Sequence, residues 1–367
     1  AADRPNIVLI LADDLGFGSL NSYGADEAHI QTPNIDRLAK EGRRFTDVNT
    51  PSSVCSPTRY GLLTGRYDWR TDQKHGVLNT TDPLHIDVSR PTIASLLKSA
   101  GYRTAAIGKW HLGYGTERHD FRKPLSPGPL DIGFDYHFAV PQNHGDAAGV
   151  YVRNREVAGL RSDRMVPAGT SPYGREYMGI DAPQRVDENV MDELTTDAIQ
   201  WLERQSDDAP FFLYFAPVAI HFPYTPSDAT EGTSGTGLYG DWIHELDLSV
   251  GRILDALDHM ELSEDTLVIF TSDNGGVLMT EGDRPEAEAY RADDRRVIET
   301  GDPRRGIREP IRRADGTRLW LETTKEPLRD EAGRVIGILG LYTDVSEQRQ
   351  NEADLRRAQN MLQIVLD

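Results

Sequence analysis

Four short apolar runs are spread along the first 276 residues, and each has the length of a buried β-strand. They are rich in β-branched and aromatic residues and show no regular polar alternation, which is typical of parallel strands covered on both faces. The runs are residues 7–11, 104–107, 211–220 and 266–270. They predict a mainly parallel central sheet.

Segments with the apolar spacing of amphipathic helices lie between these runs. They are residues 32–45, 91–100, 188–205 and 239–262. Strands that alternate with helices predict an α/β fold in which helices cover both faces of the sheet. The stretch 113–187 is rich in Gly, Pro and charged residues, and we expect it to form long loops over the rim of the sheet.

The pattern changes after Gly276. Charged residues dominate 281–305. Three segments with two-residue alternation follow, at 306–313, 318–325 and 334–343. The turn signal Ala314-Asp315-Gly316-Thr317 separates the first two, so these segments predict a small antiparallel three-stranded sheet.

An amphipathic helix is predicted for residues 345–366, where Asp344 and Glu347 form a capping-box pattern. Together with the change of pattern, this indicates two domains, at 1–280 and 281–367. A chain of 367 residues is long enough for both.

The charge of the chain limits its partners. The 59 Asp and Glu residues outnumber the 40 Lys and Arg residues, which gives a formal net charge of −19. Nucleic acids and anionic membranes attract basic surfaces, so neither is expected as a partner. The longest apolar stretch, 211–222, contains Pro217 and His221 and is too short to span a bilayer.

Polar side chains follow each of the four predicted strands. In open parallel sheets, ligands bind just beyond the carboxyl ends of the strands, so we expect these groups to meet at one edge. They are Asp13 and Asp14, Lys109 and His111, His221, and Asp273 and Asn274.

The two acidic pairs, Asp13 with Asp14 and Asp273 with Asn274, indicate a cation site. Adjacent carboxylates repel one another unless a cation compensates them. Oxygen ligands suit a hard ion such as Ca²⁺ or Mg²⁺ rather than zinc. Each pair by itself would also fit loop capping or a turn.

The single cysteine opens the string Cys55-Ser56-Pro57-Thr58-Arg59. Pro57 fits the first turn of a helix, which places Cys55 at an N-terminus, where backbone N–H groups favour an anion. Arg59 lies one turn on and can hold an oxyanion through two N–H groups. The alternative is a buried cysteine that acts as a small apolar residue.

This string resembles the sulfatase signature Cys-x-Pro-x-Arg, in which the cysteine is oxidised to formylglycine. Thr58 is a minor departure, since Ser or Ala is more usual there. The string Gly-Lys-Trp-His-Leu-Gly at 108–113 is a second sulfatase hallmark. The resemblance covers about residues 4–276 and implies an alkaline-phosphatase-like fold.

By this resemblance, Asp13, Asp14, Asp273 and Asn274 bind one divalent ion, usually calcium, together with the formylglycine oxygen at position 55. Lys109 would bind sulfate oxygens, and His111 would act as the base that releases sulfate. His221 would contact sulfate and protonate the leaving alcohol. Apart from the resemblance, His144 lies in the predicted long loop region and is a further candidate to line the substrate pocket. A formylglycine-generating enzyme is the implied maturation partner.

The tail, 285–367, resembles the C-terminal half of a PAS sensor domain without its first two strands. We expect it to pack on the preceding domain or to pair with another chain, as in a homodimer. A sulfatase usually carries a second active-site lysine after the Asp-Asn pair. The only later lysine here is Lys325, in the tail, so no residue is matched to that role and activity could be impaired.

The expected function is hydrolysis of aryl or carbohydrate sulfate esters. One alternative is a phosphoryl-ester hydrolase of the same superfamily. Another is a PAS-type sensor or interaction protein with a vestigial or fused sulfatase-like part. A sulfatase-like chain suggests a periplasmic or secreted protein, whereas a PAS-like tail suggests the cytoplasm.

Overall fold

The computed structural model describes most of the chain. The described residues are 4–73, 76–146, 148–170, 176–205, 208–276, 296–298, 300–312, 318–330 and 333–346. The chain divides into two compact units, 1–277 and 278–367, which are treated separately below. None of the described helices is long and apolar enough to cross a membrane.

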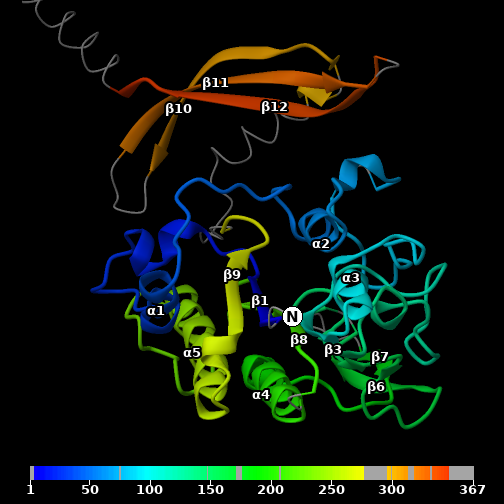
Figure 1. The fold of residues 1–367 in the computed structure, drawn as a ribbon. Helices are drawn as coiled ribbons and strands as arrows, with labels where there is room; N and C mark the ends of the chain where they lie inside the picture. The colour runs from blue at the N-terminus through cyan, green and yellow to red at the C-terminus, as the bar shows by residue number, and fades with distance from the viewer. Residues whose placement is uncertain are drawn as a thin grey trace, which may run out of the picture. The chain divides into compact units, whose positions relative to one another are not determined.

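A seven-stranded sheet forms the centre of the first unit (Figure 1), in the order β5-β4-β3-β2-β8-β1-β9. Its five parallel strands are β1 (Asn6–Ala12), β2 (Arg103–Lys109), β3 (Tyr136–Val140), β8 (Phe211–Ala216) and β9 (Thr266–Ser272). Beyond β3, the short strand β4 (Val152–Arg153) pairs antiparallel with β3, and β5 (Glu156–Val157) pairs antiparallel with β4 at the edge of the sheet. A separate ribbon pairs β6 (Met165–Thr170) with β7 (Glu176–Ile180).

Helices cover both faces of this sheet. They are α1 (Pro33–Glu41), α2 (Cys55–Thr64), α3 (Ile93–Ser99), α4 (Val190–Glu203) and α5 (Leu238–His259). Short 3-10 helices join these elements: η1 (Phe17–Ser19), η2 (Asn21–Tyr23), η3 (Asp68–Arg70), η4 (Pro129–Asp131), η5 (Asp187–Asn189) and η6 (Ser263–Asp265).

Two hydrophobic cores lie on the opposite faces of the sheet. Successive strand residues point to opposite faces, so Val8 and Ile10 of β1 enter the core that includes residues of α1, α4 and α5. Leu9 enters the other core, together with Tyr60 of α2 and Ala94 of α3. The predicted α/β fold with helices on both faces is therefore confirmed.

The boundaries differ from the sequence-based prediction in two places. The predicted strand 211–220 ends at Ala216, because the chain turns after that residue. The stretch 113–187 is not only loop, since it contributes β3 to the central sheet, paired in parallel with β2. A strand of five residues that includes a histidine, Tyr136–Val140, is too short and too polar to stand out as an apolar run.

The second unit contains an antiparallel sheet with the order β10-β11-β12. Its strands are β10 (Arg304–Arg312), β11 (Arg318–Arg329) and β12 (Val335–Asp344), close to the predicted segments. The predicted turn at 314–317 and the terminal helix beyond Ser346 lie outside the described residues.

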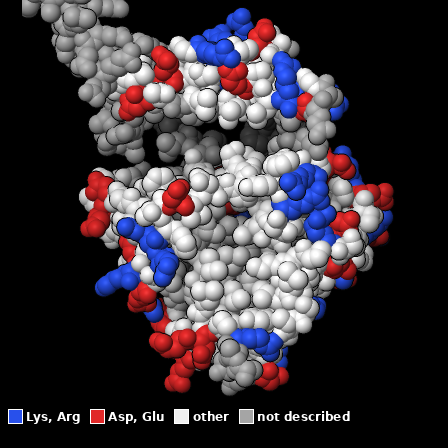
Figure 2. All heavy atoms as spheres, turned by 45° about the horizontal axis from the view of Figure 1, so that its top comes forward, with Lys and Arg blue, Asp and Glu red and all other residues white. Residues whose placement is uncertain are grey.

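Charged side chains are unevenly distributed on the surface. On the first unit, Figure 2 shows a face where uncharged residues fill most of the centre, while acidic and basic side chains gather mainly toward its margins. Basic residues form separate local groups there, although the chain as a whole carries a formal charge of −19.

Stability should depend on pH through His137 of β3, which is 1% exposed. Its Nδ1 lies 3.1 Å from the Ala106 carbonyl oxygen, and its Nε2 lies 3.0 Å from the Tyr114 hydroxyl. Burial lowers the pKa of His137 from 6.5 to about 3, although the Ala106 carbonyl opposes the shift. Below pH 6.5 the unfolded chain therefore binds a proton at this residue that the folded chain does not.

Acidification from pH 6.5 toward 3 should thus cost stability, by up to about 1.4 kcal/mol for each pH unit. Between pH 7 and 5, wild type should lose about 2 kcal/mol more free energy of unfolding than His137→Gln. Urea unfolding of both proteins at the two pH values measures this difference. Equal losses would show that His137 does not carry this pH dependence.

Candidate active site

The carboxyl ends of β1 and β9 bring two acidic pairs together. The strands run parallel with Ala12 beside Ser272, so the residues that follow each strand become neighbours. Asp273 Oδ1 accepts a hydrogen bond from the Asp14 backbone N–H at 3.1 Å. The Asn274 Nδ2 amide donates to Asp14 Oδ1 at 2.6 Å.

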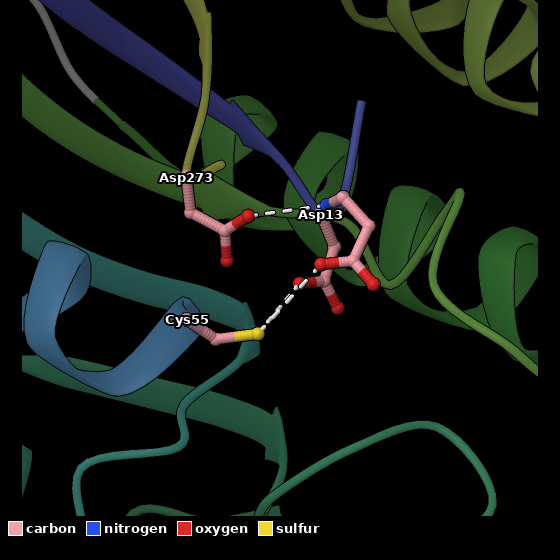
Figure 3. A group of neighbouring side chains, drawn as sticks. Asp13, Cys55 and Asp273 are labelled. Atoms are coloured by element: carbon pink, nitrogen blue, oxygen red, sulfur yellow. Dashed lines mark hydrogen bonds between the residues drawn. The ribbon is translucent and has the colours of Figure 1, made fainter. Parts of the chain in front are cut away.

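The N-terminus of α2 adds the cysteine to this acidic cluster. Cys55 Sγ points toward the carboxylates (Figure 3) and lies 3.6 Å from Asp13 Oδ1 and 3.9 Å from Asp14 Oδ1. Ligand atoms of these three residues and of Asp273 lie within 4.8 Å of one another, and all four residues are buried. The structure thus brings together residues that are up to 260 positions apart in the sequence.

Arg59 lies beneath the cluster and is fully buried. Its guanidinium group donates to Asp273 Oδ2 at 2.7 and 3.1 Å and to Asp13 Oδ1 at 3.2 Å, and its Nη1 donates to the Lys109 carbonyl oxygen at 2.9 Å. From the sequence, this guanidinium was expected to bind an oxyanion. In the structure, the anions that it holds are the carboxylates of the chain itself.

Lys109, the last residue of β2, is the second buried cation. Its Nζ donates to the two carboxylate oxygens of Asp13 at 2.6 and 2.8 Å and lies 3.3 Å from Cys55 Sγ. Burial acts to lower the pKa of Lys109, but the Asp13 carboxylate outweighs it and raises that pKa. Lys109 therefore stays protonated in contact with the cysteine.

The charges of the site do not balance. Burial acts to raise the pKa of Asp13, but Lys109 and then Arg59 hold that pKa below its ordinary value. Burial, together with repulsion from Asp13, raises the pKa of Asp273. Three carboxylates, with Asp14 as the third, face the two buried cations Lys109 and Arg59. A further positive charge would relieve this repulsion.

Asn274 supplies a further oxygen that fits a cation. Its Oδ1 is buried and accepts no hydrogen bond from the described residues. An unsatisfied buried carbonyl is costly, and an ion bound by oxygen ligands is one way to satisfy it. The donor set of carboxylate and amide oxygens therefore suits a hard divalent cation.

The Cys55 thiol is a weak nucleophile in this environment. Burial raises its pKa to about 12, and Lys109 only partly opposes the shift. The thiolate is the reactive form of cysteine, so an unmodified thiol would be almost entirely protonated at neutral pH.

His111 lies just beyond β2 and has a left-handed backbone conformation (φ 57°). Its Nε2 lies 3.0 Å from the Leu78 carbonyl oxygen, and its Nδ1 has no hydrogen-bond partner among the described residues. A carbonyl only accepts, so Nε2 carries the proton and Nδ1 the lone pair. Burial, followed by the charge of Lys109, lowers the pKa of His111 well below its ordinary value.

Two groups that position His111 were not predicted from the sequence. The Ser56 hydroxyl donates to the His111 carbonyl at 3.0 Å and accepts from the Leu78 backbone N–H at 3.1 Å. The Leu78 carbonyl fixes the His111 ring. A backbone carbonyl has no side-chain signature, so no pattern in the sequence could have identified it.

Two further histidines lie near this edge. His221 Nε2 is 3.8 Å from Asp14 Oδ2, and its side chain is 20% exposed. His144 is buried, with Nε2 2.7 Å from the Thr225 hydroxyl and Nδ1 without a partner among the described residues. Burial lowers the pKa of His144 to about 4, and Lys109 and His221 contribute to the shift, as expected for a residue near the same cluster.

Comparison with known proteins gives consistent matches. Residues 5–302 match the family model described as Sulfatase, and residues 278–350 match one described as PAS fold. An N-acetylgalactosamine-6-O-sulfatase of Bacteroides thetaiotaomicron is 36% identical over 310 residues, which cover 76% of this chain and 60% of that protein. The N-acetylgalactosamine-6-sulfatase of Homo sapiens is 36% identical over 289 residues, 76% of this chain and 52% of that protein.

A solved structure, described in connection with the metabolism of multiple glycosaminoglycans by Bacteroides thetaiotaomicron, is similar over 99% of both chains. Its TM-score is 0.72, and its sequence identity is 25%. The chain spans only 52 to 60% of the length of the two relatives compared above.

Proposed function

Because the chain belongs to the sulfatase family, we propose that it hydrolyses the sulfate esters of carbohydrates or of aryl alcohols. One observation carries this proposal: Cys55 Sγ lies 3.3 Å from Lys109 Nζ inside a buried cluster of oxygen ligands. A reacting group at position 55 would have a cation beside it for the oxyanion of a substrate. Preorganised charge of this kind is usually the largest contribution to catalysis of such reactions.

We further propose that Cys55 is converted to formylglycine by a maturation enzyme. Once hydrated, this side chain would supply a hydroxyl group as the nucleophile toward the ester sulfur. The high pKa of the thiol supports the need for conversion, since a protonated thiol attacks poorly. The position of Cys55 at the first residue of α2 also places it beside backbone N–H groups that favour an anion.

Ca²⁺ is the ion that we propose for the acidic cluster, with Mg²⁺ as the alternative. Asp13, Asp14, Asp273, the Asn274 carbonyl oxygen and the side chain at position 55 would hold it. The ion would polarise the oxygens bound to it and offset the negative charge of the site. The unsatisfied Asn274 Oδ1 and the excess of carboxylates over cations support this assignment.

The chain's own residues divide the remaining work. Lys109 donates N–H groups to sulfuryl oxygens as negative charge develops there. His221 is the most exposed member of the site, and its ring can donate a proton to the oxygen of the leaving alcohol. His111 accepts a proton at Nδ1, because Nε2 donates to Leu78 and the lowered pKa keeps the ring neutral. Arg59 is a positioning residue that holds Asp13 and Asp273.

All of these residues lie in the first of the two domains that we propose, 1–280 and 281–367. No residue is assigned to the second active-site lysine of the family. Lys325, the only lysine after Asp273, is on β11 of the second unit.

Parallel assays on 4-nitrophenyl sulfate and 4-nitrophenyl phosphate test the proposed reaction after co-expression with a formylglycine-generating enzyme. We expect kcat/KM to favour the sulfate by about a hundredfold or more, equivalent to about 2.7 kcal/mol of transition-state stabilisation. Mass spectrometry of the peptide that contains residue 55 should find the aldehyde. Turnover of the phosphate alone would identify a phosphoryl-ester hydrolase, and an intact thiol would refute the proposed nucleophile.

A further inference from the structure

Two aromatic side chains are exposed directly after α2. Tyr67 is 52% exposed and Trp69 is 59% exposed. Their rings stack, with centroids 5.6 Å apart and planes inclined by 19°. Single exposed aromatic residues are common, but two stacked rings that both face solvent are a feature to be explained.

Arg70 extends this stack. Its guanidinium carbon lies 5.1 Å from the centre of the Trp69 ring. No carboxylate lies within ion-pair distance of Arg70 among the described residues, and its guanidinium group donates no hydrogen bond to any of them. A guanidinium held over a ring keeps the N–H groups at its edge available for an anion. We call Tyr67, Trp69 and Arg70 the aromatic–arginine stack.

The backbone beneath the stack is firmly held. Asp68, between the two aromatic residues, is buried and lies 2.6 Å from His85 Nε2. The Asp68 carbonyl accepts hydrogen bonds from the backbone N–H and the hydroxyl of Thr71, both at 2.7 Å. Residue 68 therefore points inward while residues 67 and 69 point outward, so the exposed rings are ordered before any ligand binds.

The same anchor connects the stack to the active site. The His85 ring lies 4.8 Å from the ring of Tyr60, in the middle of α2. The His85 backbone N–H donates to the Leu112 carbonyl at 2.9 Å, one residue after His111. α2 begins at Cys55 and has ten residues, so its far end lies about 15 Å along the helix axis from the reacting side chain, and the stack follows that end.

A second arginine increases the positive charge near the stack. Arg66 Nη2 donates to the Arg70 carbonyl at 2.7 Å, and no carboxylate pairs with Arg66 among the described residues. In a chain with a formal charge of −19, two arginines that have no carboxylate partner among the described residues give this surface a local positive charge, which favours an anion.

We propose that the aromatic–arginine stack is a remote binding site for a sulfated carbohydrate chain, one of whose other sulfate groups is hydrolysed at Cys55. The inference rests on the proposed function and narrows its substrate class to polymers or oligomers. The outer face of Tyr67 offers an apolar surface to the C–H groups of a sugar ring. The guanidinium of Arg70 matches a sulfate group, which it can hold through two N–H groups.

The preordered stack explains why such a site could be effective. A flexible arginine must lose rotamer freedom when it binds an anion, but Trp69 already orients Arg70. A small aryl sulfate bound at Cys55 has neither a second sulfate group nor a sugar ring to offer to the stack. Binding at the stack should therefore affect only substrates that extend over several sugar units.

The test compares Tyr67→Ala and Arg70→Gln with two control variants. Leu96→Ala removes an apolar side chain of α3 that is 60% exposed, and Lys40→Ala removes a positive charge from the end of α1. Dissociation constants are measured by calorimetry in a Cys55→Ala background, so that the sulfate groups stay intact. The probes are chondroitin sulfate, an iota-carrageenan hexasaccharide and chemically desulfated chondroitin.

We expect Tyr67→Ala and Arg70→Gln each to weaken binding of a sulfated chain about tenfold, with little change in the controls. Activity is measured with the same stack variants in protein that keeps Cys55. Their kcat/KM on the sulfated chain should fall by a similar factor, while their kcat/KM on 4-nitrophenyl sulfate stays within about twofold of wild type. Desulfated chondroitin should bind weakly to every variant.

Three results would overturn the proposal: wild type binds neither sulfated chain, the stack variants bind as the controls do, or turnover of 4-nitrophenyl sulfate falls in parallel. If wild type hydrolyses no sulfate ester at all, the proposed function fails. The dissociation constants would still decide whether the stack binds sulfated carbohydrate.

Discussion

Replacement of Cys55 by alanine should reduce turnover of 4-nitrophenyl sulfate by at least about three orders of magnitude, which corresponds to about 4 kcal/mol of lost transition-state stabilisation. The variant loses the sulfur atom of the side chain from which we propose that the nucleophile is made. Lys109, His111 and His221 would remain, but charge stabilisation without a nucleophile gives only slow attack by water. The measurement is kcat/KM with protein co-expressed with the maturation enzyme.

Ser53→Ala is the matched control for this variant. Ser53 precedes Cys55 by two residues, is exposed and lies outside the Cys-x-Pro-x-Arg string. Its replacement should leave kcat/KM within about twofold, because no group of the reaction is removed. Unchanged turnover in Cys55→Ala would refute the assigned nucleophile, provided that Ser53→Ala is also active.

Replacement of Arg59 by methionine should lower the free energy of unfolding by about 3 to 5 kcal/mol. Methionine keeps most of the apolar volume but removes the charge. Asp13 and Asp273 would then lose a partner that contacts both of them, in a region with no access to water. Urea unfolding with a chelator present measures the loss without any contribution from a bound ion.

Two comparisons make this prediction specific. Arg252→Met breaks an exposed pair with Asp192 and should cost less than about 1 kcal/mol. The double variant Arg59→Met, Asp273→Asn also removes one of the two carboxylates that lost their partner. It should therefore recover part of the free energy of unfolding that Arg59→Met loses.

Calcium should also stabilise Arg59→Met, because it brings positive charge to the same carboxylates. If Arg59→Met loses no more free energy of unfolding than Arg252→Met does, Arg59 does not hold the acidic cluster together. The absence of any calcium effect on wild type and on Arg59→Met would contradict the proposed ion site.

Much of the fold was predictable because the central strands are buried on both faces. Their apolar runs stand out against the helical spacing around them, and β1, β2 and β9 lie where the runs predicted them. The strand β3 was missed since it is short and contains His137, whose polar ring pairs with a backbone carbonyl and a tyrosine hydroxyl inside the core. Only the folded chain supplies those partners.

The proximity of the candidate site residues was predictable where local sequence and topology act together. Each strand run ended in polar residues, and parallel strands end at a common edge, so Asp13, Lys109 and Asp273 could be placed near one another in advance. The partner of Arg59 could not be foreseen. A guanidinium holds carboxylate and sulfate equally well, and the choice depends on which anion the fold places beside it.

By itself, the sequence determined the order of strands and helices, the residue types at the sheet edge and the Cys55 string, because these depend on periodicity and local composition. The tertiary structure alone decided which nitrogen of His111 is free, which carboxylates Arg59 holds, and that Tyr67, Trp69 and Arg70 form one exposed stack. These features depend on contacts between residues that are distant in the chain or on the orientation of side chains, and neither is encoded in a local pattern.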